Sequence, residues 1–173
     1  MSDTPLPAAL RPLALLNHWL GRGIAWLTLV MMLAMCAVVV MRYALGANSI
    51  ALQESITYLH GMVFMLGMAY TWQQDEHVRV DIFYRNWSVQ RQALVNLLGT
   101  LLFVIPLTIF LLVVSWDYVA NSWAIRESSA ESSGLPFIWL LKTLLLLMPA
   151  LLLLQAIVEL ARSASQLRRG AQP

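Results

Sequence analysis

The chain has 173 residues, of which 60% are hydrophobic and 12% are charged, and its formal net charge is +2. In soluble domains roughly a quarter of all residues are charged. This composition therefore excludes an ordinary soluble domain and favours a protein embedded in lipid. The basic residues form no cluster, which argues against a nucleic-acid partner. The single cysteine, Cys36, excludes an intramolecular disulfide and a metal site of paired cysteines.

The sequence contains four long apolar runs, each near the ~20 residues that cross a bilayer as a helix. They cover about residues 24–41, 50–72, 93–116 and 136–161. We therefore predict an all-α membrane protein with four transmembrane helices, organised as a single domain over residues 1–173. Before the first run, the apolar positions of Leu13–Arg22 predict a short interfacial helix, or else an extension of the first span.

Prolines interrupt two of the predicted spans. Pro106 and Pro149 lie inside the third and fourth runs, where a missing backbone N–H can kink a helix. Pro136 is interpreted as a first-turn proline that opens the fourth helix.

Positive charges predict the orientation. The two tails and the connection between the second and third runs contain eight of them: Arg11, Arg22, Arg79, Arg85, Arg91, Arg162, Arg168 and Arg169. The opposite side contains three: Arg42, Arg126 and Lys142. Because Lys and Arg accumulate on the cytoplasmic side, we predict cytoplasmic N- and C-termini. The loops near residues 42–53 and 117–135 then face outward.

Ionisable residues within membrane helices are costly and are functional candidates. Glu54 lies about one turn into the second run, and Arg42 lies at the outer end of the first. We interpret them as a self-neutralising pair or as contacts to a partner subunit. The alternative is a proton-carrying Glu54 in an autonomous small exporter.

His60 lies deeper in the second run than Glu54 does. Two facing histidines would indicate haem ligation, but His18 and His77 belong to the inner interface. We therefore interpret His60 as a histidine hydrogen-bonded between helices. A membrane anchor subunit of a redox enzyme is the alternative.

The connection after the second run also carries ionisable residues. Asp75, His77 and Asp81 have metal-compatible spacing, but nothing supplies a second coordination shell. We interpret this segment as a solvated turn that pins the end of the second span. No metal site, no cofactor site and no catalytic motif is predicted.

Two charged positions fall in the fourth run. Lys142 lies about two turns into the predicted span and can snorkel outward or reach Glu54 or Asp117. Glu159 and Arg162, three residues apart, predict an ion pair on one helix face.

Several short motifs follow one another along nearly the whole chain. They are Arg42-Tyr43, Leu52-Gln53-Glu54, Gly67-Met68-Ala69-Tyr70 followed by His77-Val78-Arg79-Val80-Asp81, Glu131-Ser132-Ser133-Gly134-Leu135-Pro136, and Pro136-Phe137-Ile138-Trp139-Leu140-Leu141-Lys142 with the later Gln155. In this order and spacing the chain resembles the DctQ-like family, the small membrane subunits of tripartite ATP-independent periplasmic (TRAP) transporters. The family often carries two adjacent carboxylates where this chain has Gln53-Glu54.

The resemblance implies a multi-pass protein of the bacterial inner membrane. It implies a stable complex with a large membrane subunit and transient contact with a periplasmic binding protein that delivers an organic anion, of carboxylate type, for sodium-coupled uptake. The chain would then be a scaffold subunit, not an enzyme, with partners but no cofactor. The residues expected to fix helices and partners are Arg42, Gln53, Glu54, His77, Asp81, Arg126, Glu127, Glu131 and Lys142. The charges of the outer loop, Asp117–Leu135, are expected to contact the binding protein.

Overall fold

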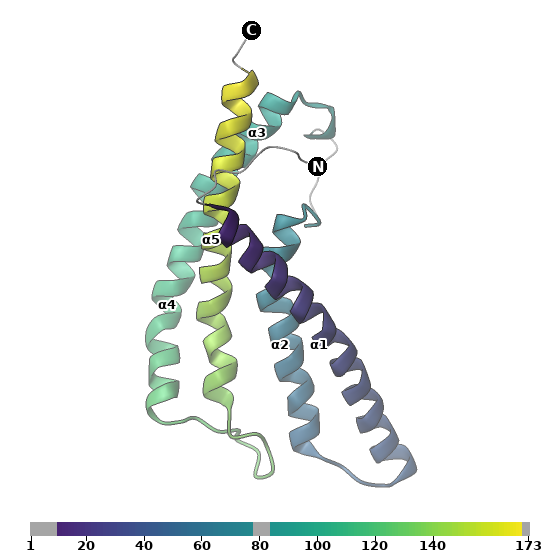
Figure 1. The fold of residues 1–173 in the computed structure, drawn as a ribbon. Helices are drawn as coiled ribbons and strands as arrows, with labels where there is room; N and C mark the ends of the chain where they lie inside the picture. The colour runs from purple at the N-terminus through teal and green to yellow at the C-terminus, as the bar shows by residue number, and fades with distance from the viewer. Residues whose placement is uncertain (1–9, 78–83, 171–173) are drawn as a thin grey trace.

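The computed structural model describes residues 10–77 and 84–170, and this part of the chain is helical without any strand (Figure 1). Its elements are α1 (Arg11–Ala44), α2 (Ile50–Gln73), the short 3-10 helix η2 (Tyr84–Asn86), α3 (Val89–Gly99), the π-helix η3 (Thr100–Val104), α4 (Ile105–Ala124) and α5 (Ile138–Gly170). The prediction of an all-α protein is confirmed.

The four long helical segments stand side by side in a row. α5 packs against α4 on one side and α2 on the other. α1 crosses α2 obliquely, with its N-terminal part against α5 and its C-terminal part on the outer side of α2 (Figure 1). The α1–α2 and α4–α5 connections lie together at one end of the row, which we call the loop end. The opposite end, with the first turn of α1, the last turn of α2, α3 and the last turns of α5, is called the terminal end.

In the part of the chain that the structure describes, three helical stretches are long and apolar enough to cross a membrane: Arg11–Ala44, Val89–Ala124 and Ile138–Arg168. By length and composition the described residues thus give three candidate spans and not the predicted four. The second predicted run does fold as a helix, α2, close to the predicted bounds. Gln53, Glu54 and His60 lower its apolar character, and it is not among these candidates.

The segment before the first predicted span is not a separate interfacial helix. Residues 11–44 form one continuous helix, as the alternative interpretation held. Its buried positions Ala14, Asn17, Gly21 and Ile24 recur every three or four residues and make one packed face. At Gly21 an added Cβ would lie 2.0 Å from Cγ of Tyr70 on α2, so only glycine allows this approach of the two helices.

The prolines are accommodated in different ways. Pro106 follows the π-turn η3, in which the Ile105 N–H donates to the Thr100 carbonyl and the helix continues into α4. Pro149 lies fully buried within α5. Pro136 precedes α5, because the N–H groups of Leu140 and Leu141 both donate to the Phe137 carbonyl. The interpretation of Pro136 as a first-turn residue is thus wrong by a few positions.

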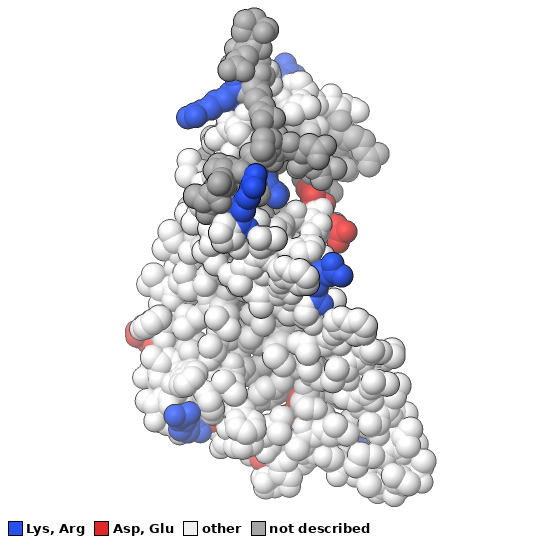
Figure 2. All heavy atoms as spheres, in the orientation of Figure 1, with Lys and Arg blue, Asp and Glu red and all other residues white. Residues whose placement is uncertain are grey.

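Charged side chains gather toward the two ends of the row on the face drawn in Figure 2. A broad uncharged surface runs along the helices between them. This distribution suits helices that lie in hydrocarbon with their ends in the polar headgroup layers.

Candidate functional site

At the loop end, the carboxylate of Glu54 binds the connection between α4 and α5. We call residues 125–137 the α4–α5 loop. Glu54 accepts a hydrogen bond from the Ser129 hydroxyl and one of 2.6 Å from the Leu135 backbone N–H. Ser49 caps α2 through a 3.3 Å bond from the Leu52 N–H, which fixes the helical turn that carries Glu54. One side chain therefore ties α2 to two points of a loop distant in sequence.

The α4–α5 loop folds back on itself around this carboxylate. The Ser129 N–H donates to the Leu135 carbonyl at 3.1 Å, and the Gly134 N–H donates to the Glu131 carbonyl at 3.0 Å. An added Cβ at Gly134 would lie 2.3 Å from the Ser129 hydroxyl oxygen and 2.7 Å from Oε1 of Glu54. Only glycine leaves room for the carboxylate at this point.

A second charged contact holds the start of the same loop. Lys142 on α5 forms an ion pair with Glu127, with Nζ and Oε2 2.5 Å apart. The hydrogen bond from Lys142 holds the pKa of the Glu127 carboxyl below its ordinary value. The Lys142 ammonium also lies 4.0 Å from the ring centroid of Tyr118. Lys142 thus reaches a carboxylate, as the sequence suggested, but its partner is Glu127 and neither of the two examples, Glu54 and Asp117.

Aromatic rings complete this side of the loop. Trp123 and Trp139 meet edge to face with ring centroids 4.4 Å apart, and the Trp123 indole N–H donates to Thr143 Oγ1 at 2.9 Å. The Arg126 guanidinium lies over both rings, 5.6 Å from the Trp123 centroid and 4.8 Å from that of Trp139. Arg126 has a positive φ of 49°, a backbone conformation that turns the chain sharply after α4.

The other predicted residues of the loop end are placed as follows. Arg42 is exposed in the last turn of α1, and the structure records no ion pair between it and Glu54, both of which are described. The self-neutralising pair is therefore not formed. The Gln53 amide donates to Asn48 Oδ1. Gln53, Glu54 and Glu131 line an open cavity of ≈ 380 Å³.

At the terminal end, His77 is exposed, and its Nε2 lies 3.2 Å from the Met68 carbonyl. This contact fits the interpretation of a turn that pins the end of α2. Asp75 precedes it with a positive φ of 63°. Asp81 lies outside the described residues. Within residues 10–77 and 84–170, no group of three or more His, Cys, Asp and Glu side chains could hold a metal ion.

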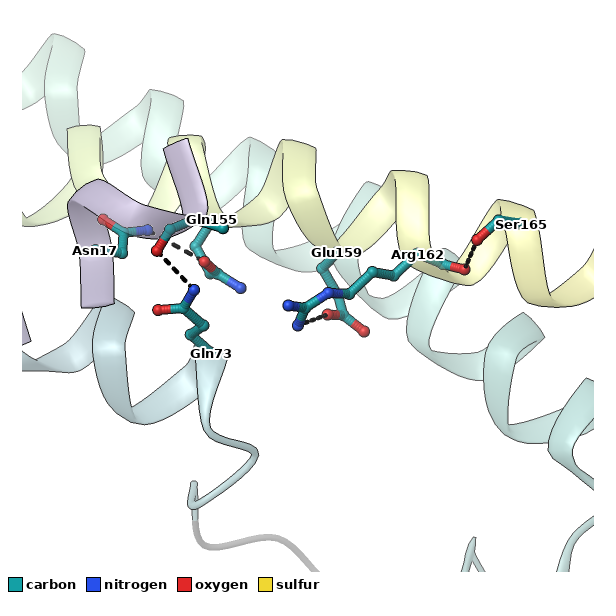
Figure 3. A network of polar contacts seen from close by, with 7 residues as sticks. Asn17, Gln73, Gln155, Glu159, Arg162 and Ser165 are labelled. Carbon is teal, nitrogen blue, oxygen red and sulfur yellow. Dashed lines mark hydrogen bonds and ion pairs between the residues drawn. The ribbon is translucent and has the colours of Figure 1, made fainter. Parts of the chain in front are cut away.

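A cluster of side-chain amides at the terminal end was not predicted. Asn17 on α1 donates to Gln155 Oε1 on α5 at 3.1 Å, and Gln73 on α2 donates to the Ala14 carbonyl at 2.8 Å (Figure 3). Asn17 and Gln155 are 2% and 0% exposed. An isolated amide within an otherwise apolar run was the one signal in the sequence for this contact.

The ion pair predicted further along α5 is confirmed. Arg162 Nη1 and Glu159 Oε2 lie 4.0 Å apart, beyond the amide cluster toward the terminal end (Figure 3).

The family model described as "Tripartite ATP-independent periplasmic transporters, DctQ component" matches residues 31–166, from the middle of α1 to the last turns of α5. Neither the curated proteins nor the solved structures include a match to this chain. The family is a transporter component and not an enzyme. The matched segment contains Glu54, the α4–α5 loop and Lys142, and it covers most of the chain. The chain therefore belongs to the DctQ family, the small membrane components of tripartite ATP-independent periplasmic transporters.

Proposed function

We propose that this chain is the static scaffold subunit of its transporter. It supports the large membrane subunit during sodium-coupled uptake of a carboxylate-type organic anion delivered by a periplasmic binding protein. The observation that carries the proposal is the use of the ionisable groups on α2 and α5. Glu54 and Lys142 both bind the protein's own loop, so that their charged groups are engaged within the chain. Groups engaged in this way brace helices and suit a part that stays still while another subunit moves.

The proposed orientation follows from the charges and the arrangement of the helices. The terminal end faces the cytoplasm, in keeping with the excess of Arg residues in the tails and the α2–α3 connection. The loop end, with Glu54 and the α4–α5 loop, faces the periplasm. The tryptophans Trp123 and Trp139 then lie in the outer headgroup layer, which amphipathic rings favour.

This orientation makes the α4–α5 loop the contact for the binding protein. Glu54 and Lys142 order its backbone from beneath, whereas Arg126 and Glu131 are exposed. An ordered loop loses less conformational entropy on docking than a loose one. Exposed charges of both signs favour a weak, salt-sensitive encounter.

The scaffold role is tested by deletion of this subunit from cells that keep the other two proteins. We expect uptake of the transported anion to be lost although the binding protein and the large subunit are present at normal levels. Full uptake without the chain would overturn the proposal. Solute transport by the purified chain alone in liposomes, or a haem absorption band in it, would also contradict the proposal.

Docking is tested separately by charge reversal on the loop. Arg126→Glu and Glu131→Lys are expected to lower uptake at low binding-protein concentration and to change its dependence on salt. Unchanged uptake and salt dependence in both variants would show that the binding protein docks elsewhere. Reversal of Arg91 is the matched control, since this residue is exposed on α3, far from the loop.

A further inference from the structure

A stripe of polar side chains runs along an open side of α2. Gln53, Thr57 and His60 follow one another at helical spacings of four and three residues and so share a face. Thr57 and His60 are exposed, and among the described residues neither side chain has a hydrogen bond. The one recorded contact of the His60 ring is stacking on Phe64, with centroids 6.2 Å apart and planes at 17°.

This stripe borders a groove between α1 and α2. The groove has a volume of ≈ 490 Å³ and is lined by Met31, Met32, Met35 and Cys36 on α1 and by Ile56, Thr57 and His60 on α2. His60 lies ten residues after Ile50, the first residue of α2. At 1.5 Å per residue this is ~15 Å from the loop end, about half of a ~30 Å hydrocarbon layer.

Lipid is a poor occupant for such a groove. Acyl chains offer no hydrogen-bonding partner, and an unsatisfied polar group in hydrocarbon costs several kcal/mol, as an order of magnitude. The outer helices of the row have the surface expected against lipid, since α1 and α4 expose many large hydrophobic side chains. On α2, Phe64 is the one such side chain that is strongly exposed. The groove therefore has the chemistry of a protein contact, with flexible methionines that can repack against a partner.

We propose that a helix of the large membrane subunit docks in this groove and presents a hydrogen-bonding side chain to His60 and Thr57. The inference rests on the proposed scaffold function and adds the face through which the scaffold is joined. A neighbouring transmembrane helix can supply apolar side chains that pack against Met31, Met32 and Met35. It can also supply a hydrogen-bonding partner for the polar side chains of α2.

Cys36 provides a direct test, because it is exposed in the groove and is the one cysteine of the chain. The complete transporter is labelled in native membranes with a thiol-reactive, photoactivatable cross-linker and illuminated. We expect an adduct between this chain and the large subunit that disappears in Cys36→Ala. The control combines Cys36→Ala with Val113→Cys. Val113 is 69% exposed and lies on α4, the outer helix on the opposite side of α5 from α2. We expect at least several-fold less adduct from this control.

Equal or stronger cross-linking from Val113→Cys would overturn the inference, and so would an adduct of Cys36 with lipid alone. In both cases co-purification of the large subunit with the unmodified chain would leave the scaffold function standing. Failure of the large subunit to co-purify with the unmodified chain would overturn the proposed function and the inference with it.

A second test removes the polar groups. The double variant His60→Leu with Thr57→Val is expected to reduce the amount of large subunit that co-purifies in mild detergent several-fold. His60→Gln keeps a hydrogen-bonding group and is expected to retain most of the co-purified large subunit. Both positions are exposed and make no hydrogen bond to any residue that the structure describes, so the fold itself should persist. A helical spectrum like that of the unmodified chain checks this point. Full retention of the large subunit in the doubly substituted variant would overturn the inference.

Discussion

The two ends of the helix row are held together by different chemistry. At the loop end, ionised side chains reach from α2 and α5 to a loop: Glu54 to Ser129 and Leu135, and Lys142 to Glu127. At the terminal end, neutral amides join helix to helix, Asn17 to Gln155 and Gln73 to the backbone of α1. The ionised groups are partly exposed, whereas Asn17 and Gln155 are almost completely buried.

This difference follows from where a charged group can keep enough hydration to be stable. An ion near the headgroup layer keeps part of its hydration, and its charge-assisted hydrogen bonds can order an irregular loop. Within the packed helices the desolvation of an ion would outweigh the bonds that it makes, so an amide is the stronger choice there. Asn17 Oδ1, Gln73 Oε1 and Gln155 Nε2 have no hydrogen-bond partner among residues 10–77 and 84–170. The amide cluster is therefore suited to setting helix register more than to adding stability.

The largest expected effect is at Glu54. Glu54→Leu removes the acceptor of both loop hydrogen bonds and leaves the Ser129 hydroxyl and the Leu135 N–H without their partner. We expect opening of the α4–α5 loop to rise by roughly tenfold or more, since local opening follows the contacts that are lost. Limited proteolysis of the loop measures it. Glu54→Gln keeps an acceptor, so its loop cleavage should lie between that of the unmodified chain and that of Glu54→Leu. Equal cleavage in these three forms would show that Glu54 does not hold the loop.

Gly134→Ala tests the contact between Glu54 and the α4–α5 loop from the side of the loop. The new Cβ would lie within 2.3 Å of the Ser129 hydroxyl oxygen, so the loop must move away from Glu54. Overpacking of this kind costs about 1–3 kcal/mol. We expect loop cleavage to increase, while Gly99→Ala, where an added Cβ meets nothing within 4 Å, should leave it unchanged. Normal cleavage in Gly134→Ala would mean that the loop tolerates the methyl group.

At the terminal end, a double-substitution cycle separates register from stability. Asn17→Leu alone leaves the buried Gln155 amide without its hydrogen bond and is expected to cost about 1–3 kcal/mol. Asn17→Leu with Gln155→Leu removes both polar groups and is expected to restore most of that loss. Thermal unfolding in detergent measures the series. A doubly substituted form less stable than Asn17→Leu would show that the amides stabilise the bundle directly.

The sequence predicted the helices better than it predicted their contacts. Long apolar runs fix helix positions through hydropathy alone, and so α2 was predicted almost to its last residue. The sequence also predicted α2 as an apolar span. The many apolar residues of the run hide the polar residues that recur in it at helical spacing. The sequence left open whether residues 13–22 form a separate helix or extend the first span, because the buried face of this segment depends on contacts with α2 and α5.

The partners of the candidate residues were beyond sequence reasoning. Glu54 binds a hydroxyl and a backbone N–H that lie 75 and 81 residues away, and neither carries a charge that would mark it as a partner. For Lys142 the sequence suggested snorkelling or a carboxylate such as those on α2 and α4, yet the turn after α4 brings Glu127 to it. Such pairings depend on loop geometry, which hydropathy does not encode.

The smallest expected effect is the pH dependence of the Lys142–Glu127 contact. The pKa of Glu127 lies below its ordinary value of 4.5 because of the hydrogen bond from Lys142. A lowered pKa in the folded state means that the contact contributes fully above pH 4.5 and is lost as the pH falls through the folded value. Because Glu127 is partly exposed and the pair is screened by salt, we expect only a small rise in loop cleavage by an acid-stable protease below that pH. The Glu54 carboxylate on α2 binds the same loop, so the comparison is made with Glu127→Gln. That variant should show the raised cleavage already at neutral pH and a weaker response to acid. An identical acid response in Glu127→Gln and the unmodified chain would assign the whole pH dependence of the loop to other groups.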